Sequence, residues 1–400
     1  MLIDSPVHVD NGMGPNFTSR VIWRAGFQDH LQLNRDRFYD GLRDRDRRPR
    51  LEGWLEPIRL AYRRDDYEVN SVHETNLRFA TRLNSFGSRP DAYWPKGYGK
   101  PSPLELAERA SKAEGLTDVD LNYPDHVGSD PRETGEEIRA LGLAVNGFAM
   151  RYYSNPAFKI GAFTNPDPAV RREAIELTKR GIDAARQAGC NLMTLWLGQD
   201  GFDYAFQADY ARLWADEIQG IREVALHDPD CLVSIEYKPN EPRSHSLMPD
   251  CATTLLALKE VDLPNVGMTL DFAHVLYADE QRAFAAALIN RHSRLLGMHL
   301  NDGYSKRDDG LMVGAVHSIQ TIELLRQAKL DGFAGPIYFD TFPDLTGLDP
   351  IKECEANIAT VKSMLRVVDS LDADNELRGA IALQDPVTTQ AIVRKAMFGS

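Results

Sequence analysis

The sequence contains no apolar run close to the roughly 20 residues that a membrane-spanning helix needs. Residues 1–11 also lack the basic and then apolar pattern of a secretory signal. The four cysteines are scattered, with no CxxC pair, which favours reduced core thiols over disulfides. These absences predict a cytoplasmic protein that makes no membrane contact.

Basic residues are outnumbered by acidic ones, 46 Lys and Arg against 59 Asp and Glu, and the formal net charge is −13. Proteins that bind the phosphate backbone of nucleic acids usually present a basic face. The arginine-rich segment 43–50 interleaves Arg with Asp, and the aspartates cancel much of its positive field. We therefore expect no nucleic-acid partner.

A GxGxxG turn after the first predicted strand, which is typical of open dinucleotide-binding sheets, is also missing. From about residue 76, short apolar strands alternate instead with amphipathic helical segments. Such a series of βα units predicts an α/β fold, the (β/α)8 TIM barrel, in which catalytic groups lie at the carboxyl ends of the strands. The predicted strands are Leu77–Asn84, Asp118–Asn122, Ala144–Ala149, Asn191–Leu197, Leu232–Tyr237, Val266–Asp271, Leu295–Asn301 and Pro336–Thr341.

The barrel is predicted to span residues 76–366. Residues 1–75 do not fit the repeating pattern, and their mixed charge and single helical segment predict a partly ordered N-terminal arm that packs on the barrel or on a neighbouring subunit. Residues 367–400 predict a helical extension at the C-terminal side of the barrel.

The fifth predicted strand ends in two opposite charges. Glu236 and Lys238 are two residues apart, so alternation along a strand places both side chains on the same side. Pro239 then ends the strand because it has no N–H to donate. Charges at the end of a buried strand are costly to desolvate unless something binds there. A salt-bridged strand end is the simple interpretation, and a binding site is the alternative that the later strands favour.

Each of the next three predicted strands also ends in a group that can bind a divalent ion. One barrel rim would bring these groups together, because they are about one βα repeat apart. Converging carboxylates repel one another and become protonated unless a cation is present. One nitrogen and three oxygens predict a metal site, with Mn²⁺ the first candidate and Mg²⁺ or Co²⁺ the alternatives. The predicted ligands are Glu236, Asp271, His299 and Asp340.

These motifs resemble the xylose isomerase-like TIM barrels, with features of both xylose isomerase and rhamnose isomerase. Segment 235–243, Ile-Glu-Tyr-Lys-Pro-Asn-Glu-Pro-Arg, is similar to the xylose isomerase segment that holds a metal-bound glutamate and a substrate-side lysine. Segment 195–201 is similar to the tryptophan–glycine turn of the family's fourth strand. The Glu-Asp-His-Asp order of the ligands resembles the metal site of rhamnose isomerase. The resemblance covers about residues 76–366.

The resemblance also implies a second, catalytic ion, bound in the isomerases by a histidine after the sixth-strand ligand and by a loop with an Asp-x-Asp-Leu pattern. His274 matches the histidine and Asp308 matches the first loop aspartate, but Gly310 stands where the second is expected. Asp309 and Asp302 are the candidates to replace it. This departure leaves open both a hydride shift and a proton transfer by His274 or an aspartate.

The activity that the resemblance implies is that of a metal-dependent aldose–ketose isomerase, an intramolecular oxidoreductase acting on a small sugar. Asp340 and Lys238 favour this reaction over 3-epimerisation, because the related ketose 3-epimerases have a glutamate on the eighth strand and lack the lysine. The resemblance also implies a homodimer or homotetramer. The residues expected to be catalytic are Lys238, His274 and Asp308, and those expected to bind the sugar are Trp196, His126 and Phe342.

Three other functions compete with this one. A single-metal 3-epimerase, or an enzyme that cleaves the C-glycosides of keto sugars, would share the site and differ in its product. A phosphate-ester endonuclease would need more histidines on the rim and a basic groove, which the net charge of −13 disfavours. A non-catalytic sugar-binding protein has no use for a free amine beside a metal ligand, so Lys238 disfavours it.

Overall fold

The computed structural model describes residues 77–94 and 99–399, and the predicted arm 1–75 lies outside them. Eight parallel strands close into a barrel in the order β1-β10-β9-β8-β6-β4-β3-β2. This confirms the predicted (β/α)8 TIM barrel. Its strands are β1 Phe79–Arg82, β2 Asp118–Tyr123, β3 Ala144–Met150, β4 Leu192–Leu195, β6 Leu232–Glu236, β8 Val266–Asp271, β9 Leu295–Leu300 and β10 Ile337–Phe339.

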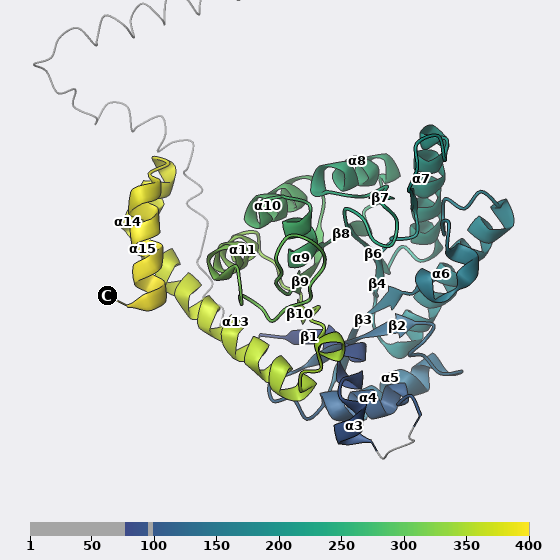
Figure 1. Cartoon of the computed structure of the whole chain (residues 1–400), viewed down its shortest axis with the longest axis horizontal. Helices are drawn as coiled ribbons and strands as arrows, with labels where there is room; N and C mark the ends of the chain where they lie inside the picture. Colours follow the sequence, from purple (N-terminus) through teal and green to yellow (C-terminus); the bar gives the residue numbers. More distant parts are fainter. Residues whose placement is uncertain (1–76, 95–98, 400) are drawn as a thin grey trace, which may run out of the picture. The chain divides into compact units, whose positions relative to one another are not determined.

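Helices surround the barrel and follow its strands along the chain (Figure 1). Several of them begin at an aspartate whose side chain accepts a hydrogen bond from the first turn; α6, for example, begins after Asp167 and ends at Gly189, which has φ 92°. Within the described residues, no helix is both long and apolar enough to cross a membrane. The helices are α4 Pro103–Ala110, α5 Pro131–Ala140, α6 Pro168–Ala188, α7 Tyr210–His227, α8 Cys251–Val261, α9 Phe272–Tyr277, α10 Arg282–His292, α11 Ser318–Leu330 and α13 Pro350–Ala373.

Shorter elements decorate the loops after the strands. Strands β5 Gly201–Phe202 and β7 His245–Ser246 pair antiparallel and join the loops that follow β4 and β6. The helices α3 Pro90–Tyr93 and α12 Pro343–Thr346 and the 3-10 turns η3 Leu83–Gly87, η4 Tyr152–Ser154 and η5 Pro156–Phe158 lie in other such loops.

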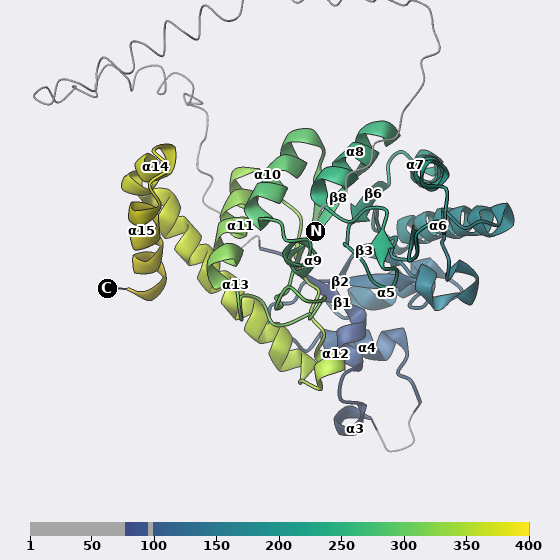
Figure 2. The same cartoon turned by 45° about the horizontal axis from the view of Figure 1, so that its top comes forward.

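Helices α14 Asn375–Ala382 and α15 Pro386–Phe398 follow α13 and lie side by side at its end in both views (Figures 1 and 2). All four cysteines are buried free thiols, as predicted. The barrel core is apolar and includes the stacked rings of Phe79 and Phe339, whose centroids are 5.8 Å apart. Such packing rigidly fixes the strand ends on which the polar groups lie.

Candidate active site

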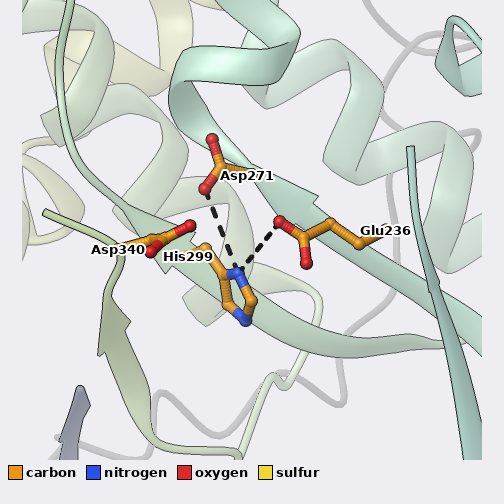
Figure 3. Close-up of side chains that lie close together, drawn as sticks. All are labelled: Glu236, Asp271, His299 and Asp340. Atoms are coloured by element: carbon orange, nitrogen blue, oxygen red, sulfur yellow. Dashed lines mark ion pairs between the residues drawn. The ribbon is translucent and has the colours of Figure 1, made fainter. Parts of the chain in front are cut away.

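The four predicted metal ligands meet at the carboxyl-end rim of the barrel (Figure 3). Asp271 ends β8 and pairs in register with His299 on β9, Glu236 ends β6, and Asp340 follows β10 directly. Each residue offers one ligand atom, and these atoms lie within 4.8 Å of one another. His299 Nδ1 is 3.4 Å from Glu236 Oε1 and 4.0 Å from Asp271 Oδ2.

The charges of this cluster depend strongly on one another. Burial opposes ionisation of Asp271 and raises its pKa to about 7. Burial also opposes charging of His299, but the Glu236 carboxylate outweighs it and raises the pKa of His299 to about 9. Burial disfavours the carboxylate of Glu236 as well, yet the neighbouring His299 lowers its pKa to about 2. The pocket thus concentrates anionic oxygens around one imidazole.

The donor set fits a divalent cation. His299 Nδ1 is buried and makes no hydrogen bond, although it is surrounded by carboxylates. Its ring stacks on Tyr338 with centroids 4.1 Å apart, which fixes its orientation. One imidazole nitrogen and three carboxylate oxygens suit Mn²⁺, Mg²⁺ or Co²⁺. Glu236, Asp271, His299 and Asp340 could therefore hold such an ion.

Asn301 orients two of these ligands, and the sequence did not single it out. It is fully buried, and its Nδ2 donates to both carboxylate oxygens of Asp271, at 3.2 and 3.1 Å, and to the backbone oxygen of Asp340 at 3.1 Å. Its Oδ1 accepts from the N–H of Ala273 at 2.8 Å. An amide at the end of β9, two residues after His299, is the sequence signal that could have identified it.

Lys238 lies beside the cluster, as its spacing from Glu236 predicts. The side chain is 7% exposed, and its Nζ donates to Asp308 Oδ2 at 3.1 Å and pairs with Glu241 Oε2 at 2.9 Å. Burial opposes the ammonium, but Asp308 and Glu241 outweigh it and raise the pKa of Lys238. The ammonium also lies 5.3 Å from the centre of the Trp196 ring. Lys238 is therefore a charged donor held at the pocket wall.

His274 and Asp308 are also brought to the cluster. His274 Nε2 lies 3.1 Å from Asp308 Oδ2, and its Nδ1 lies 3.6 Å from Glu236 Oε1. Burial disfavours the carboxylate of Asp308, but His274 and Lys238 outweigh it and lower its pKa. Asp308 Oδ1 is buried and makes no hydrogen bond. The three residues expected to be catalytic thus form one connected group.

Gly310 occupies the position of the second aspartate in the loop pattern. Gly310 has φ +57°, and a Cβ there would lie 2.2 Å from the ring of Phe342, so the ring occupies the space of a side chain. The candidate replacements have other partners. Asp309 accepts from the N–H of Tyr304, and Asp302 accepts from the N–H groups of Gly303, Val316 and His317.

A pocket of about 970 Å³ opens above these groups. Trp196 and Phe342, two of the residues expected to bind the sugar, line it. His126, the third, does not: it is buried, and its Nδ1 accepts from the backbone N–H of Asn122 at 3.2 Å. Burial, Arg151, Lys100 and Arg82 lower the pKa of His126 to about 3.

Arg82 and Asp120 are two of the polar residues that line the pocket without having been predicted. Arg82, at the end of β1, has its Nε 3.8 Å from Asp340 Oδ1, and its guanidinium lies 4.7 Å from the centre of the Phe342 ring. Asp120 on β2 accepts from Asn146 at 2.8 Å, and burial raises its pKa to about 7. An acid between Val119 and Leu121 in an apolar strand is the signal that could have identified Asp120.

The fold and this site define a TIM barrel with a carboxylate–histidine cluster at the carboxyl ends of its strands. The chain belongs to the xylose isomerase-like TIM barrel family, whose model matches residues 108–372.

Two similar proteins are xylose isomerases. That of Thermus thermophilus is 28% identical over 249 residues, which cover 59% of this chain and 64% of the relative. That of Thermus caldophilus is 25% identical, with 56% of this chain and 62% of the relative covered. The chain therefore matches less than two thirds of the length of each relative.

Solved structures share the fold at low sequence identity. The structure of an L-ribulose 3-epimerase has a TM-score of 0.59 at 16% identity, and the match covers 75% of this chain and 99% of the epimerase chain. A D-allulose 3-epimerase from Methylomonas sp. has a TM-score of 0.56 at 15% identity, with 72% and 97% covered. These likenesses show the barrel architecture.

Proposed function

We propose that the protein is a divalent-metal-dependent sugar isomerase that interconverts an aldose and a ketose, with Mn²⁺ as its preferred ion. The observation that carries the proposal is the buried ammonium of Lys238 beside the carboxylate–histidine cluster, in contact with Asp308 at 3.1 Å. A structural metal site has no use for such a donor at the wall of an open pocket. The xylose isomerases among the similar proteins support the same reaction.

The residues have distinct roles in this reaction. A bound divalent ion lowers the pKa of sugar hydroxyls and offsets negative charge that develops on oxygen. Lys238 donates a hydrogen bond to the carbonyl oxygen of the sugar, where negative charge grows. Trp196 and Phe342 contact the apolar C–H face of the sugar and exclude water from it.

Hydrogen moves between two adjacent carbons during isomerisation. The His274–Asp308 pair lies against Lys238, and its ionised Asp308 carboxylate can receive a proton from carbon and return it to the neighbouring carbon. Because Phe342 fills the place of the second loop aspartate, we favour this proton route over a hydride shift. Deuterium from D₂O then enters the product at the receiving carbon. Product free of deuterium would contradict the proton route and leave the isomerase proposal intact.

Replacement of Lys238 is the direct test. Lys238→Met removes the ammonium but keeps an unbranched side chain, so we expect kcat to fall by about 10²-fold or more, as when one charge-stabilising donor is lost. A panel of aldoses and ketoses, resolved by chromatography after incubation with Mn²⁺-loaded protein, measures the loss. The Mn²⁺ content of the variant is measured in parallel and should stay unchanged.

Lys352→Met is the matched control, because Lys352 is exposed on α13 away from the pocket. It should retain full turnover. Full turnover in Lys238→Met would remove the assigned role. Products that differ from the substrate only at carbon 3 would indicate an epimerase instead, and binding without turnover across the panel would indicate a sugar-binding protein. The predicted cytoplasmic location and homodimeric or homotetrameric state belong to this proposal as well.

A further inference from the structure

The cationic residues of the pocket differ in their partners. Three of the five Lys and Arg residues that line it form ion pairs with carboxylates: Arg82, Lys238 and Arg243. The other two, Arg151 and Lys159, form no ion pair with any residue that the structure describes. Both belong to the segment that follows β3.

Arg151 lies at the wall of the pocket and is partly shielded from solvent. It directly follows β3 and is half-buried, and its Nε is fully shielded yet makes no hydrogen bond. Its guanidinium lies 5.3 Å from the centre of the Tyr153 ring, which holds it over the pocket. A shielded guanidinium donor without an acceptor is unfavourable, so an anion in the pocket would be stabilised there.

The closed strand order places Arg151 across the pocket from the carboxylates. The predicted metal ligands follow β6, β8, β9 and β10, which are consecutive in the barrel. Arg151 follows β3, and the order β3-β4-β6-β8-β9 in one direction and β3-β2-β1-β10-β9 in the other places β3 opposite β9. The carboxylate–histidine cluster and the unpaired Arg151 therefore lie on opposite sides of the rim.

No carboxylate of the described residues pairs with Arg151, and burial raises the pKa of Asp120, the acid on the adjacent strand β2 that lines the same pocket, to about 7. The neighbours of Arg151 are the aromatic rings of Tyr153 and Tyr338 and the buried imidazole of His126, which stays neutral. The positive charge on this side is therefore at most partly offset, whereas an anion on the opposite side would lie near Glu236, Asp271 and Asp340. A ligand with one anionic end can bind in a single orientation.

We propose, on the basis of the isomerase function above, that the substrate is an anionic sugar whose negative group lies at the end remote from the isomerised carbons and is bound by Arg151. The planar guanidinium fork matches a carboxylate or a phosphate ester. Lys159, exposed at the mouth of the pocket, adds a second positive charge. The pocket volume of about 970 Å³ is ample for a hexose with such a group.

The experiment compares three matched sugars on the Mn²⁺-loaded full chain: an aldohexose, its terminal phosphate ester and the corresponding uronate. Calorimetry measures the Kd of each, and a coupled assay measures kcat/KM. For one of the two anionic sugars, Kd should be about 10- to 100-fold lower than for the neutral sugar, and kcat/KM should be higher by the same factor. This factor is the one expected of charge-assisted hydrogen bonds. The identity of that sugar distinguishes a phosphate ester from a carboxylate.

Variants assign the preference to the guanidinium. Arg151→Met should reduce the ratio of anionic to neutral affinity to about one, and Arg151→Lys should retain part of it, because the charge remains while the fork is lost. Arg132→Met, an exposed arginine on α5 outside the pocket, should leave the ratio unchanged. Circular dichroism and Mn²⁺ content verify that each variant is folded.

The outcomes separate this inference from the isomerase proposal. Isomerisation of neutral sugars with no anionic preference, or a preference that survives in Arg151→Met, would overturn the inference and leave the proposed function standing. Binding of an anionic sugar that depends on Arg151 but leads to no turnover would support the anion site and overturn the isomerase proposal. If none of the three sugars binds, the inference is overturned.

Discussion

Glu217 is an acidic residue in a place that disfavours charge. It lies on the buried side of α7, and neither carboxylate oxygen has a hydrogen-bond partner. Burial, with further repulsion from Asp200 and Asp216, raises the pKa of Glu217 well above its ordinary value of 4.5. The folded protein therefore keeps a proton that the unfolded chain releases at neutral pH.

We predict that Glu217→Met stabilises the protein at neutral and basic pH. An acid whose pKa is raised by folding makes the folded state lose stability as pH rises above the unfolded value of 4.5. Methionine has similar length and no proton to lose, so the variant should gain about 1–3 kcal/mol in the free energy of unfolding at about pH 8, and less near pH 5. Urea unfolding at both pH values measures the difference.

Glu223→Met on the same helix is the control for this prediction. Its carboxylate pairs with Lys179 at 2.8 Å, and despite burial this contact lowers the pKa of Glu223. Glu223 is therefore ionised in both states between about pH 5 and 8, and its replacement should change stability by the same amount at both ends of that range. A similarly flat difference for Glu217→Met would show that Glu217 is not protonated in the folded protein.

At this scale, the residues that could be predicted were those with a distinctive strand-end pattern. Glu236, Asp271 and His299 each end or interrupt an apolar strand, so an ionisable side chain at these positions is conspicuous in the sequence. Arg82 and Arg151 could not be predicted, because an arginine at the end of a strand is common, and only the closed strand order shows that both line the pocket.

At the scale of elements, the contact between α5 and the end of α6 depends on a residue without a side chain. A Cβ on Gly135 would lie 2.2 Å from the backbone oxygen of Ala188. We predict that Gly135→Ala lowers the free energy of unfolding by about 1–3 kcal/mol, because the backbone of α6 cannot yield as a flexible side chain would. Thermal and urea unfolding measure the loss.

Gly379→Ala on α14 is the matched control. No atom lies within 4 Å of a Cβ built there, and α14 is helical throughout. Alanine restricts the unfolded chain more than glycine does, so the free energy of unfolding of this variant should rise by about 0.4–1 kcal/mol. If both substitutions stabilise the protein, α5 does not pack against Ala188 as closely as the structure shows.

Strands were easier to predict than the loops between them. Apolar runs identified the eight barrel strands, since most of their residues are buried and turn residues bound each run. The packing of Phe342 against Gly310 could not be predicted, because it joins the loops after β10 and β9 through a backbone hydrogen bond of 2.9 Å. Such a contact depends on how two loops fold together, which no local pattern encodes.

At the scale of the whole molecule, assembly remains a prediction. The segment expected to contact a neighbouring subunit, residues 1–75, lies outside the described part of the chain. Light scattering coupled to size-exclusion chromatography should give the mass of a dimer or tetramer of the 44.9-kDa chain. A monomeric mass at micromolar concentration would contradict the expected homo-oligomer.

The metal cluster gives the last prediction, because it links one site to the stability of the entire fold. Glu236, Asp271 and Asp340 come from β6, β8 and β10 and converge on His299 of β9, so the mutual repulsion of the carboxylates opposes closure of the rim. A ligand that binds only the folded state stabilises it by about 2.7 kcal/mol at a hundredfold excess over its Kd. Mn²⁺ should therefore raise the melting temperature of chelator-treated protein, as measured by calorimetry. His299→Gln should lose most of this rise, whereas His227→Gln, which alters a partly exposed histidine on α7, should keep it. An equal rise in parent and His299→Gln would mean that Mn²⁺ stabilises the fold from somewhere other than this cluster.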